Sequence, residues 1–93
     1  MQIVWSLQAK RDIVEITSHI SKDKKEAALR WARSVEKKVA RLRHFPKSGR
    51  AVPEVGREEI REILVGSYRI IYKLEKTVSV LTVFHGAKKP LAL

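Results

Sequence analysis

Three short runs of β-branched and aromatic residues lie close together between Ile60 and Gly86. They span residues 60–65, 68–74 and 78–85, and only two or three residues separate one run from the next. Strands joined by such short turns must be antiparallel, because a parallel return needs a crossover of about a dozen residues or more. The sequence therefore predicts a local three-stranded antiparallel meander.

Two amphipathic helices are expected before this meander. Ser6 offers a hydroxyl for capping, and apolar residues then recur every three or four positions, which predicts a helix over about Leu7 to Ile20. Asp23, with Glu26 three residues later, has the form of a capping box. It predicts the start of a second helix of roughly 20 residues that ends before Pro46. The short connection predicts an antiparallel helical hairpin.

Two further segments complete the predicted fold. The apolar run Gln2 to Trp5 is too short to stand alone, so we expect a strand that pairs with the meander. Residues Pro46 to Glu59 contain two prolines and two glycines, and they predict a loop that brings Arg50 and Glu54 near the meander. We expect one α+β domain over residues 1–93, with the helical hairpin on one face of the sheet. Aromatic residues such as Tyr72 are expected to pack beneath the helices.

The charge balance is strongly basic, with 20 Lys and Arg against 10 Asp and Glu and a formal net charge of +10. Residues 22–50 alone hold eleven Lys or Arg against three Asp or Glu. Such a balance suits a polyanionic partner, either nucleic acid or an acidic protein, and accelerates its approach. The alternative is a solvated surface whose charges serve solubility alone.

Several classes of protein are disfavoured. The chain has no cysteine, which excludes disulfides and cysteine-based zinc sites. No run approaches the roughly 20 apolar residues of a membrane span, and the N-terminal residues lack the order of a signal peptide. The expected location is the cytoplasm, with no membrane partner. The three histidines lack metal-ligand spacing, and no motif for an organic cofactor is present.

An arginine lies in the middle of the second predicted strand. Alternation puts Arg69 and Lys73 on the opposite face from the tyrosines of that strand. This guanidinium either contacts a phosphate or a partner, or pairs inside the sheet with Glu62 or Glu54. Both possibilities are open from the sequence.

A second group of cations is expected where the third strand ends. His85 ends that strand, and two lysines follow it closely. If the register of the last two strands is even, His85 and Arg69 lie on one face. The candidate residues for binding nucleic acid or a partner protein are Arg50, Arg57, Arg61, Lys73, Lys88 and Lys89.

Three stretches carry patterns of a known family. They are Leu42 to Arg50, Arg61 to Tyr72 with the pattern Gly-x-Tyr-Arg-Ile-x-Tyr, and Val83 to Gly86. Together with the order of elements, they resemble the RelE/ParE superfamily of toxins from type II toxin–antitoxin systems. The resemblance implies a cognate antitoxin whose chain wraps the toxin. It also implies one of two activities, because ParE-like members poison DNA gyrase whereas RelE-like members, including the YoeB branch, cut mRNA on the ribosome.

The resemblance implies roles for three residues if the chain is a nuclease. Arg69 matches the sheet arginine near the scissile phosphate, His85 the general acid or base, and Glu54 the glutamate general base. RNA cleavage by its 2′-hydroxyl needs such a base, a cation and an acid. However, Pro90 to Leu93 lack the tyrosine of RelE-like members, and the helical hairpin looks more ParE-like. We predict a ParE-like gyrase inhibitor; the alternatives are a RelE/YoeB-like interferase and a non-toxic, basic nucleic-acid-binding module.

Overall fold

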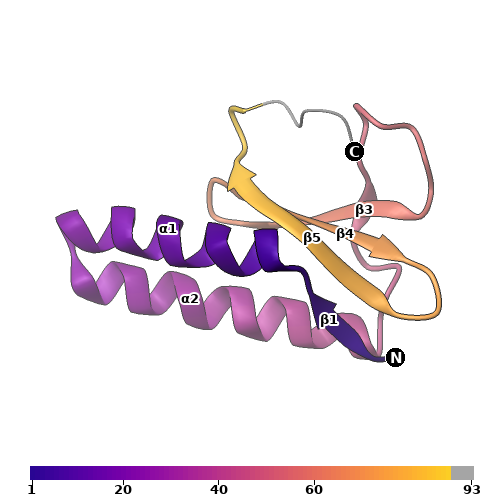
Figure 1. Ribbon diagram of the computed structural model, residues 1–93, viewed down its shortest axis with the longest axis horizontal. Coiled ribbons are helices and arrows are strands. Elements are labelled where there is room, and N and C mark those ends of the chain that lie inside the picture. Colours follow the sequence, from indigo (N-terminus) through magenta and orange to yellow (C-terminus); the bar gives the residue numbers. More distant parts are fainter. Residues whose placement is uncertain (89–93) are drawn as a thin grey trace.

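The computed structural model describes residues 1–88 and shows two helices beside one five-stranded sheet (Figure 1). In chain order the elements are β1 (Ile3–Trp5), α1 (Leu7–Asp23), α2 (Lys25–Ala40), the 3₁₀ turn η1 (Arg41–Arg43), β2 (Arg50–Ala51), β3 (Ile60–Val65), β4 (Tyr68–Leu74) and β5 (Val78–His85). The strand order in the sheet is β1-β5-β4-β3-β2. The predicted α+β fold with its N-terminal strand, helical hairpin and meander is confirmed.

The N-terminal strand joins the sheet beside the last strand. β1 is parallel to β5, with Ile3 opposite Val78 and Trp5 opposite Val80. The sheet is therefore mixed, and the helices supply the long crossover that a parallel pair requires. Ser6 then connects the sheet to α1, because its hydroxyl donates to the Leu81 carbonyl at 2.7 Å and accepts from the Ala9 amide at 3.0 Å. This is the predicted N-cap.

The helix boundaries differ from the prediction. α1 continues past Ile20 to Asp23, and only Lys24 separates it from α2. The predicted capping box is wrong, because Asp23 lies inside α1 and the extended residue Lys24 takes the N-cap place without a side-chain cap bond. The Lys24 amide still donates to the Ile20 carbonyl at 3.1 Å, which completes the last turn of α1. α2 has 16 residues, fewer than predicted, because the chain tightens into η1 after Ala40.

The main core lies between the helical hairpin and one face of the sheet. Figure 1 shows both helices on the same side of the strands. Trp31 anchors α2 here, because its indole N–H donates to the Val65 carbonyl at 3.3 Å and its ring meets that of Tyr68 edge to face. The buried members of this cluster are Ala9, Trp31, Val35, Val39, Val65, Ile70, Val80 and Val83.

The opposite face of the sheet is covered by the segment between η1 and β3. Val52, Ile60 and Ile71 form a small buried cluster there, with Phe84 packed against it. The segment that the sequence predicted as a loop also contains β2, whose Arg50 pairs with Glu62 of β3. We call this face the loop-covered face and the other the helix-covered face.

A bulge changes the register of β4 and β5 part-way along the hairpin. Tyr72 pairs with Val80 but Ile71 pairs with Thr82, so Leu81 is an extra residue in β5. Paired residues point to the same face, and a shift of one residue reverses the face of everything beyond it. The even register that would place Arg69 and His85 on one face is therefore not present, and the two side chains lie on opposite faces.

Candidate functional site

Arg69 lies on the loop-covered face, opposite Leu64 of β3 and Phe84 of β5. Its side chain is only 8% exposed. The Nε–H donates to Glu62 at 2.6 Å, and the two terminal nitrogens donate to the two carboxylate oxygens of Glu54 at 2.7 and 2.9 Å. The guanidinium carbon also lies 5.3 Å from the centre of the Phe84 ring. Pairing with both glutamates, one of the two possibilities left open by the sequence, is confirmed.

Glu62 is the buried centre of this arrangement. Its side chain has no exposed surface, and its second oxygen accepts from Arg50 Nε at 2.6 Å. A buried carboxylate costs several kcal/mol unless it is paired and hydrogen-bonded, so the two guanidiniums account for its burial. We call Arg50, Glu54, Glu62 and Arg69 the arginine–glutamate cluster. It fastens the segment between η1 and β3 to the sheet.

Glu54 forms the outer edge of the cluster, with 36% of its side chain exposed. Hydrogen bonds from Arg69 hold the pKa of the Glu54 carboxyl at about 2, and the same contact raises the pKa of the guanidinium. A carboxylate with so low a pKa is ionised at neutral pH and is a weak proton acceptor. In this arrangement the Glu54 carboxylate neutralises the charge of Arg69.

His85 lies on the helix-covered face, away from Arg69. It pairs with Tyr68, whose ring it meets nearly edge to face at 5.4 Å, and its Nδ1 accepts from the Ala87 amide at 3.1 Å. His85 borders an open groove of about 960 Å³ between β5 and α1. The groove has exposed Val14 on one side. Its charged lining is mostly basic, with Lys10, Arg11, Lys22 and Lys88 against one acidic residue, Glu15, and His19 lies beside them.

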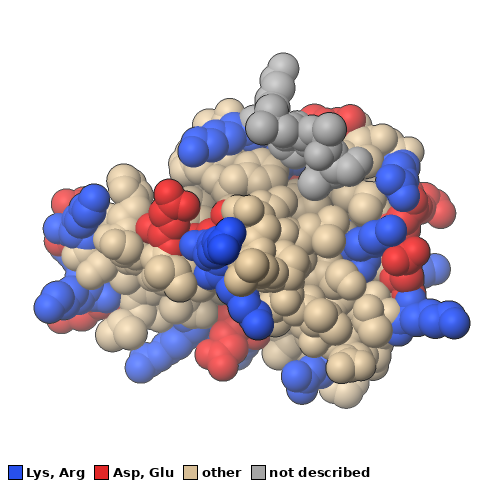
Figure 2. Space-filling model, viewed as in Figure 1, with Lys and Arg blue, Asp and Glu red and all other residues tan. Residues whose placement is uncertain are grey.

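Two of the remaining predicted binding residues are paired with nearby glutamates. Arg57 pairs with Glu59 at 2.5 Å, and Lys73 with Glu75 at 3.4 Å. Acidic and basic side chains accordingly lie side by side at the sheet end of the molecule (Figure 2). Arg61 points to the helix-covered side and donates to the Gly49 carbonyl at 2.7 Å. Lys88 is exposed, and Lys89 lies outside the described residues.

A second set of contacts, which was not predicted from the sequence, also holds the segment between η1 and β3 against the sheet. The Tyr72 hydroxyl donates to the Pro46 carbonyl at 2.7 Å and accepts from the Gly49 amide at 3.1 Å. A Cβ added at Gly49 would lie 2.5 Å from that hydroxyl oxygen, so the contact requires glycine. A tyrosine in a buried strand was the available signal, because a buried hydroxyl needs a partner.

A family model described as "ParE toxin of type II toxin-antitoxin system, parDE" matches residues 3–90. The chain belongs to the ParE toxin family. A relative named "Putative toxin Y4kP", from Sinorhizobium fredii (strain NBRC 101917 / NGR234), is 36% identical to this ParE-family chain over 88 residues, which is 91% of the chain and 88% of the relative. A solved structure described as "Chromosomal ParDE TA system from P. aeruginosa" shares the fold, with a TM-score of 0.74 at 18% identity over 91% of this chain and 95% of that one.

The predicted superfamily is thus confirmed on its ParE side. This ParE-family chain is a toxin of the type II toxin–antitoxin class, and the family implies an antitoxin partner. Within residues 1–88, neither helix has the length and apolar character needed to cross a bilayer. In the same residues, no three His, Asp or Glu side chains gather as metal ligands would.

Proposed function

We propose that this ParE-family toxin inhibits DNA gyrase by binding it, acts in the cytoplasm, and is neutralised by a cognate antitoxin. The proposal rests on the family and on the way in which the arginine–glutamate cluster is arranged. ParE-like toxins differ from RelE-like ones in having no known chemical step of their own. The question is therefore whether the arginine–glutamate cluster and His85 can form a nuclease centre or serve only as a binding surface.

The position of the candidate nuclease residues favours binding. RNA cleavage requires a base, a phosphate-binding cation and an acid around one phosphate. Here the Arg69 guanidinium already binds two carboxylates, and Glu54 is ionised with a pKa of about 2. His85 is on the other face of the sheet. This separation is the observation that carries the proposal.

The groove between α1 and β5 fits the antitoxin better than it fits a rigid nucleic acid. It combines an apolar side chain, Val14, which is 68% exposed, with the basic residues that line its walls. An acidic, amphipathic segment of an antitoxin would cover both features. Replacing Val14 with Asp should weaken capture of the co-expressed antitoxin, whereas the same change at Val4, an exposed valine of β1 that does not line this groove, should not.

A paired assay tests the target. The purified chain is added to gyrase with relaxed plasmid DNA, and separately to ribosomes that translate a defined mRNA. We expect loss of supercoiling and accumulation of cleaved DNA, with the mRNA intact. Cut mRNA together with unaffected supercoiling would establish the interferase instead.

A variant makes the same distinction in living cells. His85→Gln removes the candidate general acid and keeps a polar side chain of similar size. The interferase predicts that this variant is harmless, whereas the gyrase inhibitor predicts that it still stops replication before translation. A wild-type chain that is harmless when expressed without antitoxin would favour the non-toxic module.

A further inference from the structure

A long stretch without an acidic residue runs from the end of α2 to just beyond β2. Residues 37–53 contain no Asp or Glu, and their six basic residues are Lys37, Lys38, Arg41, Arg43, Lys47 and Arg50. Two of these have internal partners, because Lys38 donates to the Leu64 carbonyl and Arg50 pairs with Glu62. No acidic partner within residues 1–88 pairs with the other four.

Cations near a helix C-terminus have an ordinary structural explanation. Lys37 and Lys38 lie in the last turn of α2, where positive charge stabilises the helix dipole. The dipole effect falls off beyond the last turn of the helix, so it does not account for the basic residues after Ala40. It also does not explain the exposed aromatic residue Phe45. Phe45 is 59% exposed and stands between Arg43 and Lys47. We call residues 41–47 the basic turn.

The basic turn is held firmly by its backbone. The Phe45 amide donates to the Arg41 carbonyl, and the Ser48 amide donates back to the Phe45 carbonyl, both at 3.0 Å. The Tyr72 hydroxyl holds the Pro46 carbonyl, as described above. The N-terminal ammonium donates to the Arg43 carbonyl at 3.0 Å. Exposed side chains on a fixed backbone lose less conformational freedom when a ligand binds.

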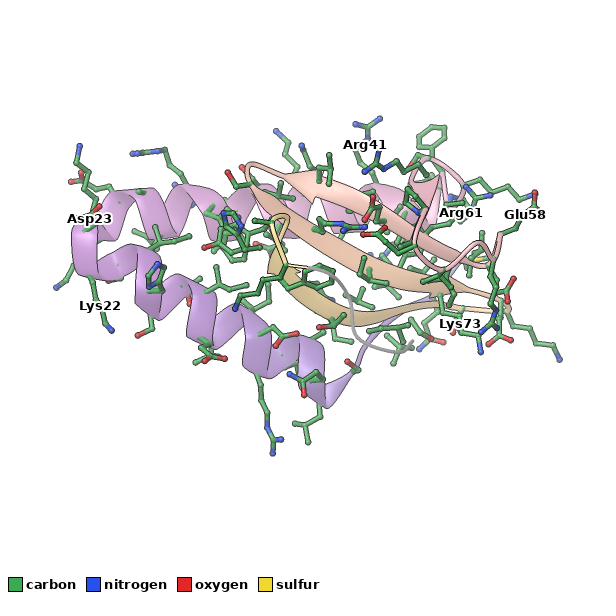
Figure 3. All side chains as sticks on the ribbon, turned by 90° about the horizontal axis from the view of Figure 1, so that it is seen from above. Lys22, Asp23, Arg41, Glu58, Arg61 and Lys73 are labelled. Carbon is green, nitrogen blue, oxygen red and sulfur yellow. The ribbon has the colours of Figure 1, made fainter. Side chains whose placement is uncertain are left out.

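A groove continues the charge of the basic turn along the edge of the sheet. It has a volume of about 430 Å³, and Lys38, Arg41 and Arg50 are its basic lining residues. Its one acidic lining residue, Glu62, is buried and paired with two arginines. Figure 3 shows Arg41 in the same half of the molecule as Arg61 and far from the end that carries Lys22. A flexible, negatively charged chain fits a path of this shape and sign.

We propose that the basic turn and this groove bind single-stranded nucleic acid. Arg41, Arg43 and Lys47 contact successive phosphates, and the Phe45 ring stacks on an unpaired base. A duplex offers the phosphates but keeps its bases stacked, so the exposed ring would gain nothing. An acidic peptide offers carboxylates but no flat ring system for Phe45. This inference does not depend on gyrase being the target.

The test measures binding of the full chain to a single-stranded DNA of about 15 nucleotides, a length that covers one such site. Fluorescence anisotropy is followed at several salt concentrations. The triple variant Arg41→Gln, Arg43→Gln, Lys47→Gln should lose about 2 in the slope of log K against log salt, since each single-strand phosphate contact contributes roughly 0.7. Phe45→Ala should weaken binding about 5- to 160-fold, and Phe45→Trp should restore it.

The matched control removes the same charges elsewhere. Lys22→Gln, Arg30→Gln, Arg33→Gln takes two arginines and one lysine from exposed positions of the hairpin, and should leave most of the slope unchanged. Thermal unfolding checks that both triple variants are folded.

Any one of three results would overturn the proposal. The first is equal binding by the two triple variants, and the second is tighter binding of a duplex than of a single strand of equal length. The third is competition by polyglutamate that is as strong as competition by DNA. Because no gyrase is present, none of these results bears on the proposed target.

Discussion

Replacing the buried carboxylate of Glu62 with an amide tests whether the arginine–glutamate cluster holds the fold together. In Glu62→Gln the side chain keeps its shape, but an NH₂ group now faces one of the two guanidiniums. Arg50 has a 61% exposed side chain and can turn to water. Arg69 cannot, because it is 8% exposed. The loss therefore falls mainly on the Arg69 contact.

The expected magnitude follows from that contact. Breaking a buried ion pair by removing one partner costs about 3–5 kcal/mol, and a hydrogen bond to a charged group contributes about 1.5–3 kcal/mol. Glu54 still holds the other side of the guanidinium, so we expect the low end, about 3 kcal/mol. For a domain of this size that lowers Tm by roughly 12–24 °C.

The assay is thermal and urea unfolding of the wild type beside two variants. Glu59→Gln is the matched control, because Glu59 also pairs with an arginine but is 36% exposed. An exposed pair contributes about 0–1 kcal/mol, so this control should shift Tm by a few degrees at most. If Glu62→Gln and Glu59→Gln unfold at the same midpoint, the cluster does not stabilise the fold and the reasoning is refuted.

Three further changes are expected to have measurable effects. Tyr72→Phe should lower the free energy of unfolding in urea by about 1–3 kcal/mol, because it leaves the Gly49 amide without its buried acceptor. Gly49→Ala should lower it further. Equal stability of the wild type and Tyr72→Phe would contradict this expectation. Glu54 has a folded pKa of about 2 against 4.5 in the unfolded chain, so its stabilisation is present above pH 4.5 and is lost as the pH falls toward 2. Glu54→Gln should flatten that part of the stability curve, and an unchanged acid slope would show that Arg69 does not depress this pKa. Ser6→Ala should cost about 0.5–2 kcal/mol by removing the α1 cap; a gain in stability would refute the capping role.

The meander could be predicted because its signals are local. Short turns force antiparallel neighbours, and alternation correctly separates Arg69 from the tyrosines of β4. Two of the three family patterns lie in these strands and the turns beside them, so the superfamily could also be predicted. The faces of the helices and the start of α1 followed from the sequence, although the end of α1 and the bounds of α2 did not. Asp23 has the right neighbours for a capping box, but the backbone of α1 continues through it.

The arrangement of the site could not be predicted, because it depends on one extra residue. Nothing in the sequence of β5 marks Leu81 as a bulge, yet that residue decides that His85 and Arg69 face apart. The arginine–glutamate cluster also depends on strand register, in this case that of β3 and β4. Glu62 and Arg69 meet as diagonal neighbours across β3 and β4, and only the observed register places them so. A sequence can name the charged residues, but the register selects their partners.

The pairing of β1 with β5 has a consequence for how the toxin is made. Ser6 finds its partner, the Leu81 carbonyl, 75 residues further along the chain. A nascent chain therefore emerges from the ribosome with its first strand unpaired and its first helix without a sheet to pack on. The sheet can therefore close only after residue 81 has left the ribosome, so the fold is completed at the end of synthesis rather than during it.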